Sequence, residues 1–295
     1  MTWTRPVRAA LLSGLTVLLP VAAPAALSAQ SAPPGSAPRG RWTLHMGYEQ
    51  GPPSGWVQVR ENRIDGSRLS LARDLGVHSV SSVAVGLERS AGSGAFGLTV
   101  TASTLRGSAV IAQPVYFNGS TLAAGTVLRT RTEAGDFVRV VVGYAHPLAR
   151  VGSSGELIGR AGLDATLLNF RLQGTLAPGS AGHETKEDFV TQELPAPFLG
   201  AQLRLPLNRR VAFHVGADGG GLPWVSSLRY EGGLVHLSQS RFDADAGVDV
   251  ALSAPLTLGA GLHATGFAQN EQSREDGNRF ALASTALALD LRWRF

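Results

Sequence analysis

The chain contains no cysteine and a single lysine, Lys186, among its 295 residues. Without cysteine there is no disulfide framework and no thiol chemistry. The arginines are dispersed and the formal net charge is only +4, whereas nucleic-acid-binding proteins gather basic residues on one face. The composition therefore predicts no nucleic-acid partner.

Beyond residue 40 the chain also lacks any apolar run long enough for a helical membrane span, which needs about 20 residues. This excludes an inner-membrane helical protein and leaves a periplasmic or an outer-membrane location. No metal-spaced cluster of His, Asp and Glu and no phosphate-binding glycine motif occurs in the sequence. The sequence therefore predicts no metal and no cofactor.

The N-terminus has the features of a targeting segment. Arg5 and Arg8 precede an apolar stretch, residues 9–19, which Pro20 interrupts, and small residues follow to Ala29. This order is typical of a cleaved signal peptide. We predict a signal peptide at 1–29, a flexible leader rich in Pro, Gly and Ser at 30–40, and one β-domain at 41–295.

The last stretch, residues 280–295, reads FALASTALALDLRWRF and alternates from Thr285 onward. Its odd-numbered positions are mostly apolar, while the even-numbered ones include Asp290, Arg292 and Arg294. Successive side chains of a strand point to opposite faces. In a membrane barrel the charged face turns inward and the apolar face meets lipid.

A terminal Phe295 with Trp293 two residues before it resembles the closing strand of small Gram-negative outer-membrane β-barrels. The phrases FNGSTLAAGT and RDLG resemble one functionally uncharacterised group of these proteins. The resemblance implies that Trp293 and Phe295 form an assembly signal. It also implies that the assembly machinery and outer-membrane lipids are partners.

The same alternation recurs along the chain, with short turns on one side and polar loops on the other. We predict an all-β fold, an antiparallel up-and-down transmembrane β-barrel of ten strands, with eight or twelve as alternatives. A soluble two-sheet protein is the competing interpretation, but tryptophans and tyrosines near strand ends favour a membrane girdle. We therefore predict a monomeric integral outer-membrane protein.

Several segments carry individual predictions. Residues 50–77 are interpreted as a long extracellular excursion, with a hairpin of its own as the alternative, and residues 126–146 as one return strand. The strand after residue 157 shifts phase near Leu167, which predicts a β-bulge. Residues 176–189 and 269–278 are predicted to be polar outer loops.

Charged residues on the inward phase form the candidate functional site. The predicted lumen charge network consists of Glu88, Arg139, Arg160, Asp164, Arg204, Asp218, Arg241, Asp243, Asp245, Asp249, Asp290, Arg292 and Arg294. Seven acids face six arginines, which favours a salt-bridged, largely plugged lumen because unpaired buried charges are costly. The alternative is a narrow pore that prefers cations, since three of the acids share one strand.

A lipid-modifying barrel enzyme is the second alternative, because such enzymes place a serine and a histidine on the lipid-facing wall. His45, His214 and His263 fall on the inward phase instead. His146 shares the outward phase but has no serine or acid beside it in the sequence. The sequence therefore predicts no enzyme and no catalytic residues.

Overall fold

Alternating apolar and polar residues give this chain strands throughout. The structure, a computed structural model, describes residues 42–117, 120–133, 135–175, 185–190, 194–230, 234–274 and 276–295. The predicted signal peptide and leader lie outside these ranges. Within the described ranges, no helix is long and apolar enough to cross a membrane.

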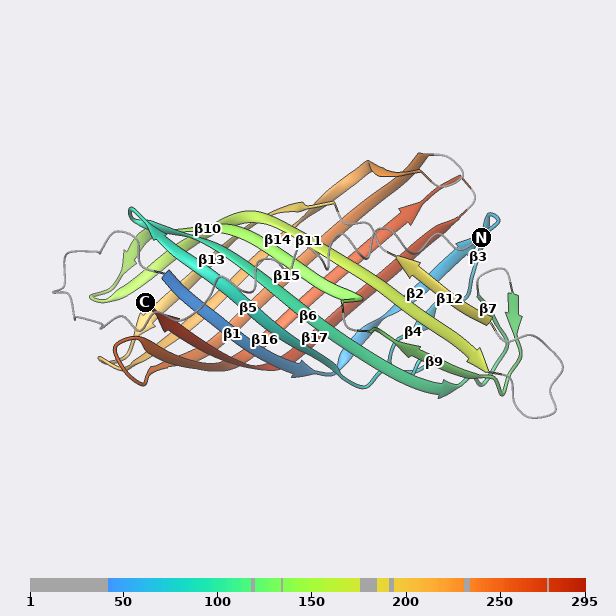
Figure 1. Cartoon of the computed structure of the whole chain (residues 1–295), viewed down its shortest axis with the longest axis horizontal. Coiled ribbons are helices and arrows are strands. Elements are labelled where there is room, and N and C mark those ends of the chain that lie inside the picture. The colour runs from blue at the N-terminus through green and yellow to red at the C-terminus, as the bar shows by residue number, and fades with distance from the viewer. Residues whose placement is uncertain are drawn as a thin grey trace.

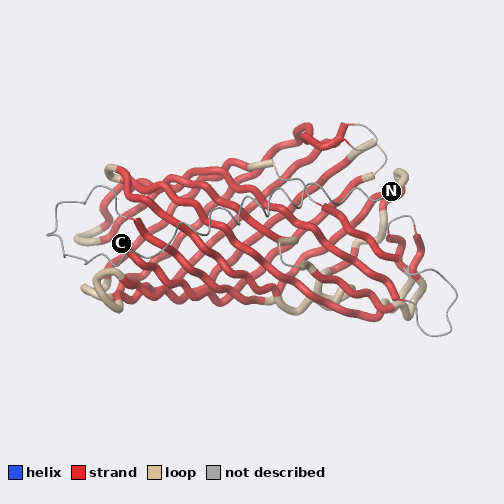
Figure 2. The backbone as a smooth tube through the Cα atoms, in the orientation of Figure 1, coloured by secondary structure: helices blue, strands red, loops and turns tan. Residues whose placement is uncertain are grey.

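Ten antiparallel strands close into a barrel, as predicted, because the first strand pairs with the last. Figures 1 and 2 show the long barrel with its strongly tilted strands. In barrel order the strands are β1 (Trp42–Gly51), β5 (Val80–Ala91), β6 (Gly94–Val110), β10 (Phe137–Val151), β11 (Gly155–Thr175), β13 (Ala196–Pro206), β14 (Val211–Tyr230), β15 (Leu234–Ala251), β16 (Leu256–Gln272) and β17 (Gly277–Arg294).

The two ends of the barrel differ in their connections. At one end the strands are joined by turns at 92–93, 152–154, 207–210 and 252–255, and both Trp42 and Phe295 lie there. At the other end several connections carry short strands of their own. Outer-membrane barrels have short periplasmic turns and longer extracellular loops. We therefore assign the end with the short turns to the periplasm.

The strands are longer than a membrane requires, and the outer end carries added strands. They are β2 (Pro53–Glu61), β3 (Ile64–Asp65), β4 (Leu69–Ser70), β7 (Val115–Phe117), β8 (Ser120–Leu122), β9 (Val127–Arg131) and β12 (Thr185–Val190). About ten tilted residues cross a bilayer, whereas β11 has 21 residues and β14 has 20. The barrel therefore extends beyond the membrane on the outer side.

The interpretation of 50–77 as an excursion was wrong in its first part, although the hairpin considered within it is present, since β2 pairs with β3. After Pro52, β2 continues along the outer half of β17, so β1 and β2 together flank that one strand. Proline has no N–H to donate, which explains why the ladder breaks there. Only the segment from about residue 66 onward leaves the wall.

Three further expectations need correction. The return strand predicted at 126–146 is two strands, β9 and β10, and β10 continues to Val151. The register shift lies between Pro147 and Ala149 on β10 rather than near Leu167. Parts of the predicted outer loops are strands, because β12 pairs with β11 and the β16–β17 ladder extends to Gln272 and Gly277; residues 176–184 of the first loop lie outside the described ranges.

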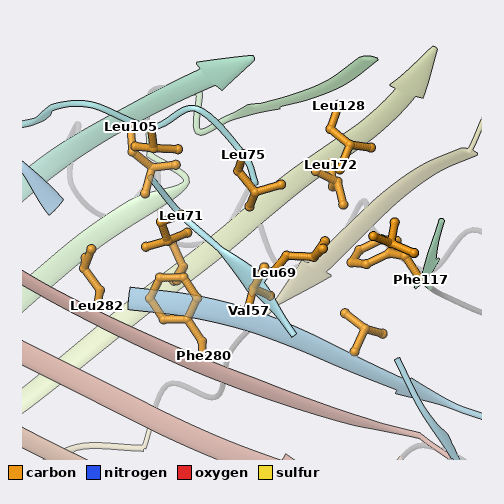
Figure 3. Packing of buried hydrophobic residues seen from close by; sticks show 14 of the residues in the cluster. Val57, Leu69, Leu71, Leu75, Leu105, Phe117, Leu128, Leu172, Phe280 and Leu282 are labelled. Carbon is orange, nitrogen blue, oxygen red and sulfur yellow. The ribbon is translucent and has the colours of Figure 1, made fainter. Parts of the chain in front are cut away.

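The outer end of the barrel contains an apolar core. Segment 66–79 folds inward, with the amide of Leu71 donating to the carbonyl of Gly55 at 3.0 Å. A Cβ on Gly76 would lie 2.3 Å from the carbonyl oxygen of Ser108, and this glycine has φ +64°, so only glycine suits the site. Figure 3 shows how the leucines of this segment, Leu69, Leu71 and Leu75, meet side chains of the wall such as Leu105 and Phe280.

We call this core the outer apolar cap. Its members are Val57, Val59, Leu69, Leu71, Leu75, Val77, Val80, Leu105, Ile111, Val115, Phe117, Leu122, Leu128, Phe137, Leu168, Leu172, Phe267, Phe280 and Leu282. A membrane barrel with a water-filled lumen would present polar groups here. The cap instead resembles the interior of a soluble protein.

Candidate site: charge layers in the barrel lumen

Midway along the lumen, arginines from one wall meet acids from the other. Arg139 on β10 pairs with Asp243 on β15 at 2.9 Å. These two strands are four places apart in the order of strands around the barrel, so the contact crosses the lumen. Arg139 also pairs with Asp164 on the adjacent strand β11 at 2.6 Å. Because the three side chains are largely buried, they hold the two walls together in a low-dielectric space.

Arg241 and His263 complete this group. Arg241 pairs with Asp164 at 2.9 Å and with Asp243 at 2.7 Å. His263 on β16 places Nδ1 2.5 Å from Glu49 Oε2 and Nε2 3.3 Å from Asp243 Oδ1. We call these six residues (Glu49, Arg139, Asp164, Arg241, Asp243 and His263) the central charge layer.

A second group lies toward the periplasm. Arg160 pairs with Asp218 at 3.3 Å and with Asp245 at 3.8 Å. Arg292 pairs with Asp249 and, at 2.6 Å, with Asp290. His214 lies 3.6 Å from Asp245 and 3.4 Å from Asp249. We call these seven residues (Arg160, His214, Asp218, Asp245, Asp249, Asp290 and Arg292) the periplasmic charge group.

Glycines let the periplasmic charge group lie flat against the wall. A Cβ on Gly216 would lie 2.9 Å from Asp245 Oδ1, and one on Gly247 would lie 3.0 Å from the ring of His214. On the opposite wall, a Cβ on Gly97 would meet nothing within 4 Å. The charges therefore cover one wall and leave open space against the other.

This open space is an inner cavity of about 670 Å³ on the periplasmic side. His45, Glu88, Arg160, Asp290 and Arg292 are among its lining residues. A smaller outer cavity of about 220 Å³ lies between the central charge layer and the outer apolar cap. Its lining includes Glu49, Ser103, Arg139, Phe137 and Phe267. The side chain of His263 borders both cavities.

The structure brings ten of the thirteen proposed network residues into ion pairs: Arg139, Arg160, Asp164, Asp218, Arg241, Asp243, Asp245, Asp249, Asp290 and Arg292. The other three lie toward the periplasmic end. Glu88 lines the inner cavity near His45. Arg204 stands opposite Glu156 on β11, and Arg294 is exposed at the end of β17.

Sequence reasoning missed three members of these groups: Glu49, His214 and His263. All three follow the inward phase of their strands, which is the signal that could have included them. The histidines were placed inward but were not paired with any acid. Strand alternation gives the face of a residue, whereas the partner depends on the height in the barrel and on the strands opposite.

His146 has a neighbour that the sequence did not indicate. Its Nδ1 lies 3.4 Å from the hydroxyl of Ser93 and 3.4 Å from the hydroxyl of Tyr144, at the periplasmic rim. Among the contacts described for His146, none is to a carboxylate that could orient it as a catalytic base. In the part of the chain that the structure describes, no group of three His, Asp or Glu could hold a metal ion.

The polarity of the barrel is inverted relative to a soluble protein. Its outward side chains are large and apolar, with Leu199 73% and Leu287 72% exposed, while charged residues such as Asp164 are buried inside. Such a wall is stable only against lipid. The chain is a transmembrane β-barrel of the outer-membrane type. Its outer-membrane location follows from this architecture.

No protein-family model matches this barrel, and no curated protein matches it in sequence. Among solved structures it is similar to the outer membrane protease OmpT from Escherichia coli, with 9% identity, 86% of this chain and 97% of that chain covered, and a TM-score of 0.48. It is similar to the translocator domain of the autotransporter NalP from Neisseria meningitidis, with 12% identity, 88% and 89% covered, and a TM-score of 0.36.

A third similar structure is the toluene transporter TodX from Pseudomonas putida, with 11% identity, 87% of this barrel's chain and 90% of that chain covered, and a TM-score of 0.37. The three names describe a protease, a translocator and a transporter. No activity therefore carries over from them to this barrel.

Proposed function

We propose that this protein is a closed outer-membrane barrel whose lumen is blocked at two levels. The outer apolar cap blocks the extracellular end, and the central charge layer blocks the middle. The protein then serves as a structural or interaction barrel, whose contacts with partners lie in its outer extension. It is neither an open channel nor an enzyme.

The chain of contacts across the lumen is the observation that supports closure most directly. Three successive contacts form this chain. Arg139 on β10 binds Asp243 on β15, Asp243 binds His263 on β16, and His263 binds Glu49 on β1. Each side chain is satisfied by the next one, so opening the layer would expose buried charges without partners. The cost of such exposure favours the closed arrangement.

A narrow cation-preferring pore is the second candidate, because the lumen carries more acids than arginines. The two charge groups hold seven carboxylates, from Glu49, Asp164, Asp218, Asp243, Asp245, Asp249 and Asp290, against four arginines. An excess of carboxylates attracts cations. The two cavities would become one path if the central charge layer opened.

Export and assembly belong to the same proposal. Cleavage after Ala29 would release a mature chain whose leader, 30–40, precedes the barrel. The rings of Trp293 and Phe295 would serve as the assembly signal, and lipids and the assembly machinery would be the partners of a monomer. Fractionation with alkaline carbonate tests the location, since release into the soluble fraction would contradict it.

Liposome swelling tests closure. Liposomes that contain the refolded protein should swell in a small sugar no faster than protein-free liposomes. Swelling that rises with the amount of protein would contradict the closed barrel. If Asp243→Asn and Asp245→Asn then changed the selectivity between cations and anions, the pore would be supported instead.

A further inference from the structure

We propose that His263 is a proton-dependent latch, which joins the two halves of the central charge layer only while both of its ring nitrogens carry a proton. The two ring nitrogens face two carboxylates, Glu49 at 2.5 Å and Asp243 at 3.3 Å. This inference rests on the proposed closed barrel, because it identifies the group that keeps the middle of the lumen shut.

The chemistry of the imidazole sets the requirement for a proton. A neutral ring has one N–H donor and one acceptor, and an ionised carboxylate can only accept. A ring held between two carboxylates therefore donates from both nitrogens, or shares one proton with Glu49. When one of these ring protons leaves, the nitrogen that lost it presents a lone pair to an ionised carboxylate, and that contact turns repulsive.

The charges around His263 come from three strands of the nearby wall and from across the lumen. Glu49 lies on β1, Asp290 lies on β17, and Asp243 and Asp245 lie on β15, with Asp245 directly opposite His263. Arg139 and Arg241 both pair with Asp243. Asp243 thus keeps two cationic partners without His263. Among the described ion pairs, Glu49 has His263 alone.

Loss of a proton should therefore act first on the contact with Asp243, the link between β16 and β15, because two arginines already neutralise Asp243. Of the six residues of the central charge layer, His263 lines both cavities, as do Gly47, Ala84, Ala288 and Asp290 outside the layer. Release of His263 from Asp243 frees the ring, still bound to Glu49, to turn toward water in the inner cavity. The two cavities then join, and small solutes from the periplasmic side reach the outer cavity.

His214 provides a matched comparison within the same lumen. It also sits between two carboxylates, Asp245 and Asp249, at 3.6 and 3.4 Å. Both of these acids lie on β15, the strand next to its own. Because His214 lies along the wall and links no distant strands, its protonation should not control passage between the cavities.

The absence of native cysteine makes a direct test possible. Ser103 lines the outer cavity and is 9% exposed, so Ser103→Cys places a single thiol behind the latch. The rate of its modification by a small methanethiosulfonate reagent is measured in detergent from about pH 5 to about pH 10. The same rate is measured with His263→Gln added. The rate with His263 present is divided by the rate with His263→Gln, and this ratio cancels the titration of the thiol.

The ratio should rise with pH, on the order of tenfold, since the glutamine cannot lose a proton. If His214→Gln is added to the Ser103→Cys protein that retains His263, the rate ratio should still rise with pH. Glu49→Gln gives a second reference should His263→Gln fold poorly, because a glutamine amide can bond to a neutral ring at any pH. A slow rate with a flat ratio overturns the latch and leaves the closed barrel standing. Fast modification at every pH overturns both.

Discussion

At the scale of single residues, the lumen shows how buried charges are tolerated. Each arginine of the central charge layer contacts two carboxylates, and each of these carboxylates has more than one cationic partner. Breaking a buried pair costs far more than the pair contributes to stability, because the remaining charge has no partner. The exposed pairs of the outer extension carry no such penalty.

Arg139→Ala should therefore lower the free energy of unfolding in urea by about 3 to 5 kcal/mol, since it leaves Asp164 and Asp243 with fewer partners. Arg131→Ala is the matched control, because that side chain is 65% exposed beside Glu133. Its loss should cost at most about 1 kcal/mol. Equal effects from both variants would show that Arg139 is not buried in a charge network.

The sequence predicted which charged residues point inward but not which ones meet. Alternation determines the face on which Arg139 and Asp243 lie. Their contact, however, joins two residues that are 104 positions apart in the chain. The height of each residue depends on strand tilt and register, which no local pattern encodes. The same limit explains why His263 and Glu49 were left out of the predicted network.

At the scale of the elements, segment 66–79 decides the shape of the outer end. Asp74 holds its turn, because its carboxylate accepts from the amide of Ser70 and from Arg73 Nε, both at 2.8 Å. The hydrogen bond from Arg73, together with that from the Ser70 amide, lowers the pKa of Asp74 below its ordinary value. This contribution to stability is present above the ordinary pKa and is lost as the pH falls through the lowered one.

Asp74→Asn should therefore loosen the turn at neutral pH and have little effect in acid. The measurement is hydrogen exchange at the Ser70 amide, expressed as the ratio of the variant rate to the wild-type rate at the same pH. The ratio should exceed one at neutral pH and approach one only as the pH falls through the lowered pKa, below the ordinary value of about 3.9. A ratio that stays constant with pH would show that the Asp74 charge does not hold the turn.

The outer apolar cap depends on a few fully buried leucines of this segment. Leu75 is completely buried between the wall and the rest of the cap. Leu75→Ala should lower the stability of the cap by about 2 to 5 kcal/mol, through lost burial and the cavity that remains. The loss of stability is measured by urea-dependent proteolysis within 66–79. Ile64→Ala is the control, because Ile64 is exposed. Indistinguishable cleavage of the two variants would contradict the packing.

The closing strand carries a prediction that packing does not explain. The ring of Phe295 is 48% exposed, although its backbone pairs with Trp42 through two hydrogen bonds. If the ring is an assembly signal, Phe295→Ser should lower the amount of folded, heat-modifiable protein in the outer membrane. Leu289→Ser changes a residue near the end of the same chain that is 55% exposed, and it should have a smaller effect. Equal losses would argue against a signal.

Strands with regular alternation were predictable, and irregular segments were not. The face of each residue on β5, β10 and β17 follows directly from the sequence. Segment 66–79 has no such period, because its leucines pack against several strands at once. Its inward fold depends on wall positions far along the chain, such as Leu105 and Phe280. No pattern in the sequence indicated that this segment lies inside the barrel.

At the scale of the whole molecule, the barrel has three levels. The inner cavity faces the periplasm, the central charge layer crosses the lumen, and the outer apolar cap fills the extracellular end. The inverted polarity of the wall and the strand count could be predicted from the sequence. The outer apolar cap could not, since it forms only when the added strands and loops meet above the membrane.

Planar-bilayer recording of the refolded protein tests closure most directly. The wild-type protein should give no stable single-channel conductance at neutral pH. The combined variant Arg139→Ala and Leu75→Ala, which weakens both blocks, should conduct. A stable conductance of the wild-type protein, unchanged by these two substitutions, would contradict the account of a lumen closed by the central charge layer and the outer apolar cap.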